Sequence, residues 1–340
     1  MNTRLRDGLV LLSRMTLGKA WNAILVWLSY RVSRTVKKSR HWGNPITLSI
    51  EPTTSCNLRC PQCPSGLRSF SRPTGMLQGD LFERLVDEQK HTLWYMTLYF
   101  QGEPYLNPEF LDMVKYASER GIYTATSTNA HYLNPENARK TIEAGLNRLI
   151  ISIDGTDQDA YGKYRIGGSL QKVLDGTKNL IEARRLSGKR SLHIMWQFIV
   201  FAHNEDQLPG IRKLAKEYGV DELVIKTAQI YDYSEGSDLL PQNEKYRRYT
   251  EMSAGFVIKN KLLNHCWRMW QSCVITWDGK VVPCCFDKDA THQIGDMKTA
   301  TFSAIWHSEA YRNFRQQVLH GRSTIEICKN CSEGTKIWES

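Results

Sequence analysis

The chain has 340 residues, a formal net charge of +10 and nine cysteines. This length accommodates one large domain and a smaller one, and the sequence shows no internal repeat or low-complexity tract, which excludes repeat and disordered architectures. Nine cysteines would indicate disulfides only in a secreted protein, so their spacing has to decide their role.

The first 42 residues carry most of the positive charge. They contain nine Lys or Arg and one acidic residue, Asp7, which gives a net charge of +8. Residues 20–30 (AWNAILVWLSY) are uncharged, but 11 residues are too few for a membrane span of about 20. Arg14 interrupts the earlier apolar run and no clear cleavage site follows, which argues against a signal peptide.

Within this arm, Trp21, Leu25, Leu28 and Val32 fall on one helical face. Basic residues follow directly, namely Arg31, Arg34, Lys37, Lys38 and Arg40. The pattern is typical of an interfacial helix beside anionic lipid. A helix packed on the protein, with its basic end in solvent, explains it equally well. Nucleic acid is a weaker interpretation, because no recognised binding module accompanies the charge.

Apolar runs alternate with helical patterns between residues 46 and 226. Strand patterns lie at residues 46–52, 96–100, 123–128, 148–153, 192–201 and 222–226. Helical patterns lie at residues 80–90, 108–120, 135–144, 170–187 and 206–218. Strands that alternate with helices predict parallel βα units, with functional groups at the carboxyl ends of the strands.

Three closely spaced cysteines follow the first expected strand. Cys56, Cys60 and Cys63, in EPTTSCNLRCPQCPSG, have the spacing Cys-x3-Cys-x2-Cys. Soft thiolates suit an iron–sulfur cluster, and three ligands leave one iron of a four-iron cluster open. A zinc knuckle is the alternative, but structural zinc usually takes four ligands and no His or fourth Cys lies nearby.

The carboxyl ends of the other expected strands carry polar residues. The second strand runs into Gln101-Gly102-Glu103-Pro104, and the third and fourth end near Asn129 and in Ser152-Ile153-Asp154. Arg165 follows in the segment YGKYR. Each of these residues alone is explained equally well as a turn or capping residue.

The cysteine loop and the strand order together resemble the radical S-adenosylmethionine (SAM) superfamily. The resemblance implies that the amino and carboxylate groups of SAM chelate the open iron. Gly102 and Glu103 match the family's Gly-Gly-Glu-Pro motif, which holds the SAM amino group, although Gln101 replaces the first glycine.

The resemblance also implies the remaining contacts to SAM. Ser152 and Asp154 resemble a ribose-contacting pair, and Asn129 lies at a strand end that contacts the cofactor. Arg165 resembles an arginine that meets the SAM carboxylate, for which a guanidinium is well suited.

A second cysteine set follows residues 231–245, a polar stretch that we expect to be a linker. The run from Trp277 to Lys280 predicts a hairpin turn between strands at 272–276 and 281–284. This tail resembles the SPASM/twitch extension of radical SAM maturases and dehydrogenases. The resemblance implies one auxiliary 4Fe–4S cluster, matched best by Cys266, Cys284, Cys328 and Cys331.

Two cysteines of the tail remain unassigned. Cys273 is an alternative to Cys266 as a ligand, and Cys285 has no role in this scheme. A four-thiolate zinc site is the alternative for the whole set.

We therefore expect an α/β fold: a partial (β/α)6 TIM-like radical SAM barrel with a small C-terminal α+β domain of the twitch/SPASM type. The expected division is an arm at 1–44, the barrel at 45–230, a linker at 231–260 and the auxiliary domain at 261–340. The expected cofactors are a SAM-binding 4Fe–4S cluster, SAM and an auxiliary 4Fe–4S cluster.

The resemblance implies reductive cleavage of SAM to a 5′-deoxyadenosyl radical that abstracts hydrogen from a substrate. An auxiliary cluster favours a net oxidation or a cross-link, as in peptide maturases. The alternatives are modification of a small-molecule or lipid-linked envelope metabolite, and a non-catalytic iron–sulfur or zinc protein. We expect an electron donor such as flavodoxin or ferredoxin, contact with an anionic membrane and no nucleic acid, in the cytoplasm or at the inner face of the membrane.

Overall fold

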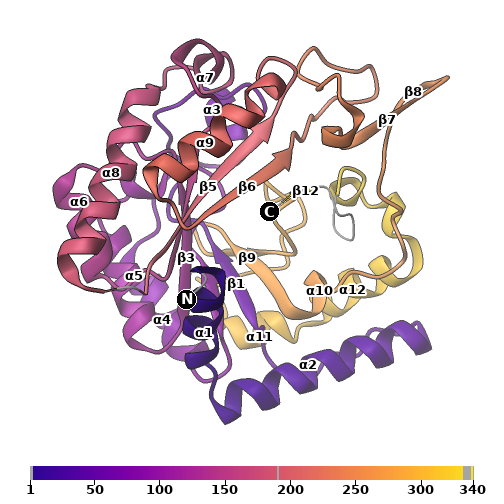
Figure 1. Ribbon diagram of the computed structural model, residues 1–340. Coiled ribbons are helices and arrows are strands. Elements are labelled where there is room, and N and C mark those ends of the chain that lie inside the picture. Colours follow the sequence, from indigo (N-terminus) through magenta and orange to yellow (C-terminus); the bar gives the residue numbers. More distant parts are fainter. Residues whose placement is uncertain (1–2, 190, 332–337, 340) are drawn as a thin grey trace.

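The computed structural model describes residues 3–189, 191–331 and 338–339. Its centre is a curved sheet with six parallel strands, covered on the outside by helices (Figure 1). The six strands are β1 (Thr47–Ile50), β2 (Tyr95–Thr97), β3 (Tyr123–Thr128), β4 (Arg148–Ser152), β5 (His193–Val200) and β6 (Glu222–Thr227). The accompanying helices are α3 (Pro64–Leu67), α4 (Gly79–Gln89), α5 (Phe110–Glu119), α6 (Pro135–Glu143), α7 (Gln158–Tyr164), α8 (Leu170–Ser187) and α9 (Leu208–Tyr218). The predicted α/β barrel fold is confirmed.

Local sequence signals set the bounds of these helices. The Ser169 side chain caps α8 by accepting a hydrogen bond from the Lys172 N–H, and Gly188 ends the helix in the left-handed conformation. In α6, Asn134 is the cap and Pro135 stands in the first turn. The bounds predicted for α8 match the structure, and the other four predicted helices differ from it by at most two residues at either end.

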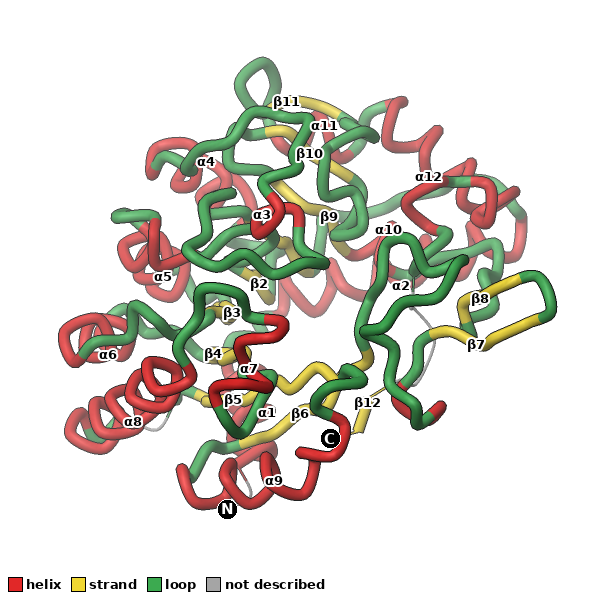
Figure 2. The backbone as a smooth tube through the Cα atoms, turned by 90° about the horizontal axis from the view of Figure 1, so that it is seen from above, coloured by secondary structure: helices red, strands yellow, loops and turns green. Residues whose placement is uncertain are grey.

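The sheet continues past the barrel at both edges (Figure 2). Strand β9 (Ser272–Ile275) pairs in parallel with β1, and β10 (Lys280–Val282) and β11 (Gly295–Asp296) follow in antiparallel order. At the far edge, β12 (Trp338–Glu339) pairs antiparallel with β6. The predicted hairpin is therefore β9–β10, and it joins the auxiliary region to the barrel as one sheet.

Residues 231–260 are more structured than a linker. They include the hairpin of β7 (Tyr249–Met252) and β8 (Gly255–Ile258), which projects from the body of the molecule in both views (Figures 1 and 2). Tyr249 is buried, and its hydroxyl contacts the backbone of Ile230 and the side chain of Asn330. The alternating polar pattern of this hairpin was too weak to identify it from the sequence.

Three further helices belong to the auxiliary region. They are α10 (Arg268–Gln271), α11 (Phe302–Trp306) and α12 (Glu309–Gly321). Met269 and Trp270 of α10 pack with Phe314 and Val318 of α12 in a second apolar core, separate from the main core between the sheet and its outer helices.

The N-terminal arm forms two helices, α1 (Thr3–Ser13) and α2 (Leu17–Val36). Helix α1 is attached through Asp7, which is buried and accepts hydrogen bonds from Tyr123 and Arg148 of the barrel. In α2, Trp21, Leu28 and Val32 of the predicted face are exposed, and Leu25 is half-buried. The arm therefore packs on the protein, but its predicted apolar face points outward. In the part of the chain that the structure describes, no single helix is long and apolar enough to cross a membrane, and α1 and α2 meet this test only as a pair bent by 98°.

Candidate functional site

A cavity of about 400 Å³ lies at the carboxyl ends of the barrel strands. The three cysteines of the loop after β1 line it together with most of the residues that the sequence analysis selected. These residues are Cys56, Cys60, Cys63, Gly102, Glu103, Asn129, Ser152 and Arg165. Positions spread over more than 100 residues of sequence thus meet at one site because parallel strands end on the same edge of the sheet.

The cysteine loop is held by its own backbone. The N–H of Cys63 donates to the carbonyl of Cys60 at 3.2 Å, and the N–H of Leu67 in α3 donates to the carbonyl of Cys63 at 2.8 Å. Gly66 lies so close to Cys60 that a Cβ there would stand 2.5 Å from the Cys60 nitrogen. The loop therefore needs glycine at this position to present its thiols to the cavity.

Gly102 and Glu103 occupy the turn after β2. Gly102 has φ +72°, and a Cβ would stand 2.3 Å from the carbonyl oxygen of Thr53, so only glycine fits. The buried carboxylate of Glu103 accepts hydrogen bonds from the Thr128 hydroxyl (2.7 Å) and the Asn129 N–H (2.8 Å). Burial raises the pKa of Glu103 to about 7 despite these donors. A buried carboxylate at a cavity wall is a suitable partner for the ammonium group of SAM.

Asp154 and Arg165 form a buried ion pair. The Arg165 Nε donates to Asp154 Oδ2 at 2.6 Å, and the N–H of Ile199 donates to Asp154 Oδ1 at 2.7 Å. Arg165 lines the cavity, with Nη1 3.8 Å from the Cys60 sulfur, whereas Asp154 is not among the described residues that line it. This geometry favours Asp154 as the residue that orients Arg165.

The sequence analysis missed two cavity residues from the auxiliary region. Cys285 and Lys288 line the same cavity as Cys56, Cys60 and Cys63 of the cysteine loop. Both follow β10, more than 200 residues after the cysteine loop. Their position depends on the pairing of β9 with β1, and no local sequence pattern predicts this pairing.

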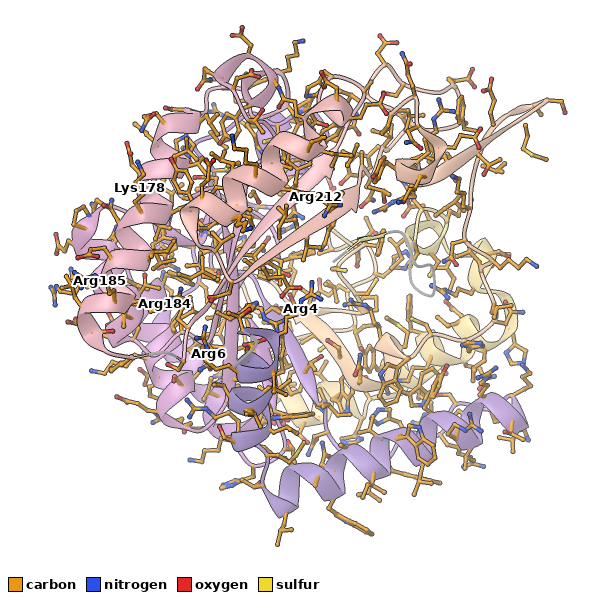
Figure 3. The ribbon with its side chains drawn as sticks, in the orientation of Figure 1. Arg4, Arg6, Lys178, Arg184, Arg185 and Arg212 are labelled. Carbon is orange, nitrogen blue, oxygen red and sulfur yellow. The ribbon has the colours of Figure 1, made fainter. Side chains whose placement is uncertain are left out.

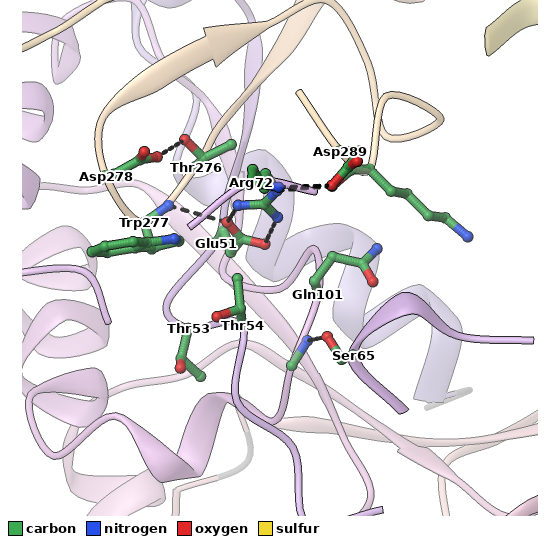
Figure 4. A network of polar contacts seen from close by, with 12 residues as sticks. Glu51, Thr53, Thr54, Ser65, Arg72, Gln101, Thr276, Trp277, Asp278 and Asp289 are labelled. Atoms are coloured by element: carbon green, nitrogen blue, oxygen red, sulfur yellow. Dashed lines mark hydrogen bonds and ion pairs between the residues drawn. The ribbon is translucent and has the colours of Figure 1, made fainter. Parts of the chain in front are cut away.

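A polar network joins Glu51 and Arg72, on either side of the three cysteines in the sequence, to the auxiliary region (Figure 4). The Arg72 guanidinium donates to both carboxylate oxygens of Glu51, at 2.8 and 2.6 Å, and its Nε donates to the carbonyl of Lys288 at 3.0 Å. The backbone N–H of Trp277 donates to the same carboxylate at 3.2 Å, and Asp289 accepts from the N–H of Ser71 at 2.9 Å. The network fixes the segment that carries Cys285 and Lys288 over the cavity.

The auxiliary cysteines lie in apolar surroundings. Cys266 belongs to the second core, and Cys284 and Cys328 pack against it. Cys331 is buried, with Arg322 Nη2 3.1 Å from its sulfur. Cys273 lies instead in the main core. This arrangement favours Cys266 over Cys273 as the fourth member of the set. Burial raises the pKa of Cys284 well above its ordinary value.

Thiolate is a ligand type that suits iron–sulfur clusters, and the two sets offer three and four of them. Among the described residues, no three Cys, His, Asp or Glu side chains converge as the ligands of one metal ion would. Ligands of a single zinc ion share one point about 2.3 Å from each sulfur, whereas a cubane places each thiolate on a different iron.

Comparisons with known proteins agree with this geometry. A model of the radical SAM superfamily matches residues 50–207, and a model of the SPASM iron–sulfur cluster-binding domain matches residues 266–332. The tungsten-containing aldehyde ferredoxin oxidoreductase cofactor-modifying protein of Pyrococcus furiosus is 28% identical over 326 residues, which cover 84% of this chain and 86% of the relative. The PqqA peptide cyclase of Bradyrhizobium diazoefficiens is 24% identical over 316 residues, which cover 85% and 79%.

A solved structure of Streptococcus suis SuiB bound to SAM has the same fold, with a TM-score of 0.63 at 14% identity over 90% of this chain and 76% of that chain. The cofactors are therefore SAM, a SAM-binding 4Fe–4S cluster and an auxiliary 4Fe–4S cluster. The chain belongs to the radical SAM superfamily and is a radical SAM enzyme with a C-terminal SPASM domain.

Proposed function

We propose that this enzyme carries out a net oxidation of a peptide substrate. The observation that carries the proposal is that Cys285 lines the SAM cavity while its neighbour Cys284 belongs to the auxiliary thiol set. The second cluster thus lies next to the site where a substrate reacts, and it suits the role of an electron acceptor. The two clusters supply one-electron chemistry when bound, and the protein supplies binding, orientation and exclusion of water.

Each residue has a defined role in this proposal. Cys56, Cys60 and Cys63 hold the SAM-binding cluster, and the auxiliary cluster is held by Cys266, Cys284, Cys328 and Cys331. The Glu103 carboxylate accepts the ammonium group of SAM and the Arg165 guanidinium binds its carboxylate. Asp154 keeps Arg165 in place through the 2.6 Å bond. Gly102 contacts the SAM amino group beside Glu103, and Asn129 and Ser152 contact the rest of SAM.

Two relatives point to different substrate classes. The name of the Bradyrhizobium relative specifies a peptide, and that of the Pyrococcus relative specifies a cofactor. We place the peptide first because the PqqA relative performs a cyclisation, which agrees with the oxidation or cross-link expected beside an auxiliary cluster. A small molecule is the second candidate.

The proposed division of the chain follows the predicted one: an arm at 1–44, a core at 45–230, a connecting segment at 231–260 and an auxiliary domain at 261–340. Both family matches fall inside the two larger parts. We also propose that flavodoxin or ferredoxin supplies the electron, and that the basic arm contacts an anionic membrane surface.

The test uses iron-loaded enzyme under anaerobic conditions with SAM and reduced flavodoxin. One reaction contains a short peptide encoded beside the gene, and the other contains metabolites extracted from the host. Formation of 5′-deoxyadenosine together with a peptide that has lost two hydrogen atoms supports the proposal. Turnover with the metabolite fraction and none with the peptide contradicts it.

A further inference from the structure

Helix α2 contacts the protein through a side that combines polar residues with Val26, which lies in the second apolar core. Its buried residues are Lys19, Asn22, Val26, Ser29 and Ser33. The Lys19 ammonium donates to the carbonyl of Gly121 at 2.7 Å, and the Asn22 amide donates to the carbonyl of Asn44 at 2.9 Å and accepts from its N–H at 2.8 Å. These bonds fix the rotation of the helix about its axis.

The opposite side of α2 exposes large apolar side chains. We call the set formed by Leu17, Trp21, Ile24, Trp27, Leu28 and Val32 the α2 stripe, and its exposed fractions range from 92% for Leu17 to 36% for Val32. Positions 17, 21, 24, 28 and 32 recur every three or four residues and therefore form one continuous line along the helix. A helix on a water-exposed surface normally buries such a line, whereas α2 leaves it exposed.

Positive charge accompanies the stripe. The exposed basic residues are Arg31, Arg34, Lys37, Lys38 and Arg40, and the sequence of α2 contains no acidic residue. The Arg31 guanidinium lies 5.8 Å from the centre of the Trp27 ring. Tryptophan and aliphatic side chains on one helix face, with basic residues at its end, match the acyl boundary and the phosphates of a bilayer surface.

We infer that α2 docks this enzyme on the surface of a bilayer that contains anionic lipids. The helix lies in the interface, with the α2 stripe among the upper acyl chains and the basic residues at the headgroups. The hydrogen bonds of Lys19 and Asn22 to the body of the protein remain in place, so docking needs no rearrangement of the fold.

Docking in this orientation directs the SAM cavity away from the bilayer. Helix α3, which follows the cysteine loop, and helix α2 lie at opposite ends of the molecule in Figure 1. Substrate and electron donor therefore reach the cavity from the aqueous side. The statement that substrate arrives from the aqueous side rests on the proposed function. It favours a peptide substrate over a metabolite held in the same membrane.

The test measures sedimentation of iron-loaded, full-length enzyme with vesicles of phosphatidylcholine alone or with one third phosphatidylglycerol. We expect binding to the anionic vesicles at low salt and release as salt screens the charges. Substitution of Trp21→Ser, Ile24→Ser and Leu28→Ser should lower partitioning by roughly a hundredfold or more. Substitution of Arg31→Gln, Arg34→Gln and Lys38→Gln should lower it by roughly a hundredfold.

Matched controls replace exposed residues elsewhere. Leu186→Ser, Val257→Ser and Leu263→Ser remove three exposed apolar side chains. Lys178→Gln, Arg185→Gln and Arg212→Gln remove three basic residues of α8 and α9, away from α2 (Figure 3). Both controls should bind vesicles within about twofold of the unmodified enzyme.

Three outcomes overturn the inference. The first is no binding to anionic vesicles at low salt, and the second is equal binding by the stripe variant. The third is a dimer in solution that the stripe variant converts to a monomer, because a second copy would then cover the stripe. Vesicle-bound enzyme should also cleave SAM at the unbound rate, and inhibition by vesicles would contradict the orientation. None of these measurements requires the substrate, so they are independent of the proposed function.

Discussion

The two thiol sites of this enzyme differ in what surrounds them. Cys56, Cys60 and Cys63 line a cavity whose walls also carry two charged side chains, Glu103 and Arg165. The auxiliary cysteines lie instead against the apolar side chains of α10 and α12, including Met269 and Phe314. The first environment suits a cluster with an open iron that binds a charged ligand. The second suits a fully ligated cluster that carries electrons, since four cysteines are available to hold it.

The largest expected effect tests the open site. Substitution of Cys56, Cys60 and Cys63 by Ala should abolish 5′-deoxyadenosine formation, because no cluster remains to bind and reduce SAM. Iron content should fall from about eight to about four atoms per chain, since the auxiliary set is untouched. The measurement is anaerobic product analysis with dithionite, alongside iron quantification. Retained SAM cleavage in this variant would remove the distinction between the two sites.

The second effect tests the closed site. The substitutions Cys284→Ala and Cys328→Ala should also leave about four irons, but SAM cleavage should persist while substrate oxidation is lost. Cys273→Ala is the matched control, because it removes a buried thiol that lies in the main core and outside the auxiliary set. It should keep about eight irons. Loss of iron in the control would show that Cys273 is a ligand.

The sequence allowed the open site to be predicted better than its surroundings. The three-cysteine loop, the turn with Gly102 and Glu103, and the bounds of α8 all rest on short-range patterns, which the structure reproduces. The position of Cys285 and Lys288 depends on pairing between strands that are far apart in the sequence. The spacing of the cysteines along the chain does not predict this pairing. The outward direction of the α2 stripe depends on the buried bonds of Lys19 and Asn22, since an apolar face alone predicts burial.

Asp154 shows a second limit of sequence reasoning. Its position at a strand end predicts contact with SAM, and the structure adds that its two carboxylate oxygens accept hydrogen bonds from Arg165 and from the Ile199 N–H. A sequence motif predicts which residues lie near a site. It does not predict which of their side chains form hydrogen bonds with one another, because this depends on distances in the folded protein.

A third prediction concerns the connection between the two sites. Removal of the Arg72 side chain from its buried pair in Arg72→Met should destabilise the protein by about 3–5 kcal/mol, because it leaves the Glu51 carboxylate buried and unpaired. The double variant Glu51→Leu/Arg72→Met should recover part of this loss. The surface pair of Arg185 and Glu182 provides the control, and Arg185→Gln should leave the denaturant midpoint nearly unchanged, because solvent screens this pair. The midpoints of denaturant-induced unfolding measure the stability of all three variants. Equal midpoints for Arg72→Met and Arg185→Gln would contradict the role of the network.

The smallest effect concerns pH. Because burial holds the pKa of Glu103 at about 7, above its ordinary value, the ionised form becomes dominant only as the pH rises through this range. Affinity for SAM, whose ammonium pairs with the carboxylate, should therefore increase from pH 6 to 7.5. Without SAM, the same rise in pH removes stability, because the folded state releases its proton later than the unfolded one.

Glu103→Gln tests this dependence. It should bind SAM roughly tenfold more weakly at pH 7.5, and its affinity should be nearly flat over the same pH range. Equilibrium dialysis of SAM against iron-loaded enzyme gives both values. An unchanged pH profile in the variant would assign the dependence to another group.

The most direct test of the central claim is electron paramagnetic resonance of dithionite-reduced enzyme with and without SAM. We predict two cluster signals in the unmodified enzyme, of which SAM shifts one. In the triple variant of Cys56, Cys60 and Cys63, the SAM-sensitive signal should be missing and the other unchanged. A SAM-dependent shift that persists in the triple variant would contradict the assignment of the open cluster to this loop.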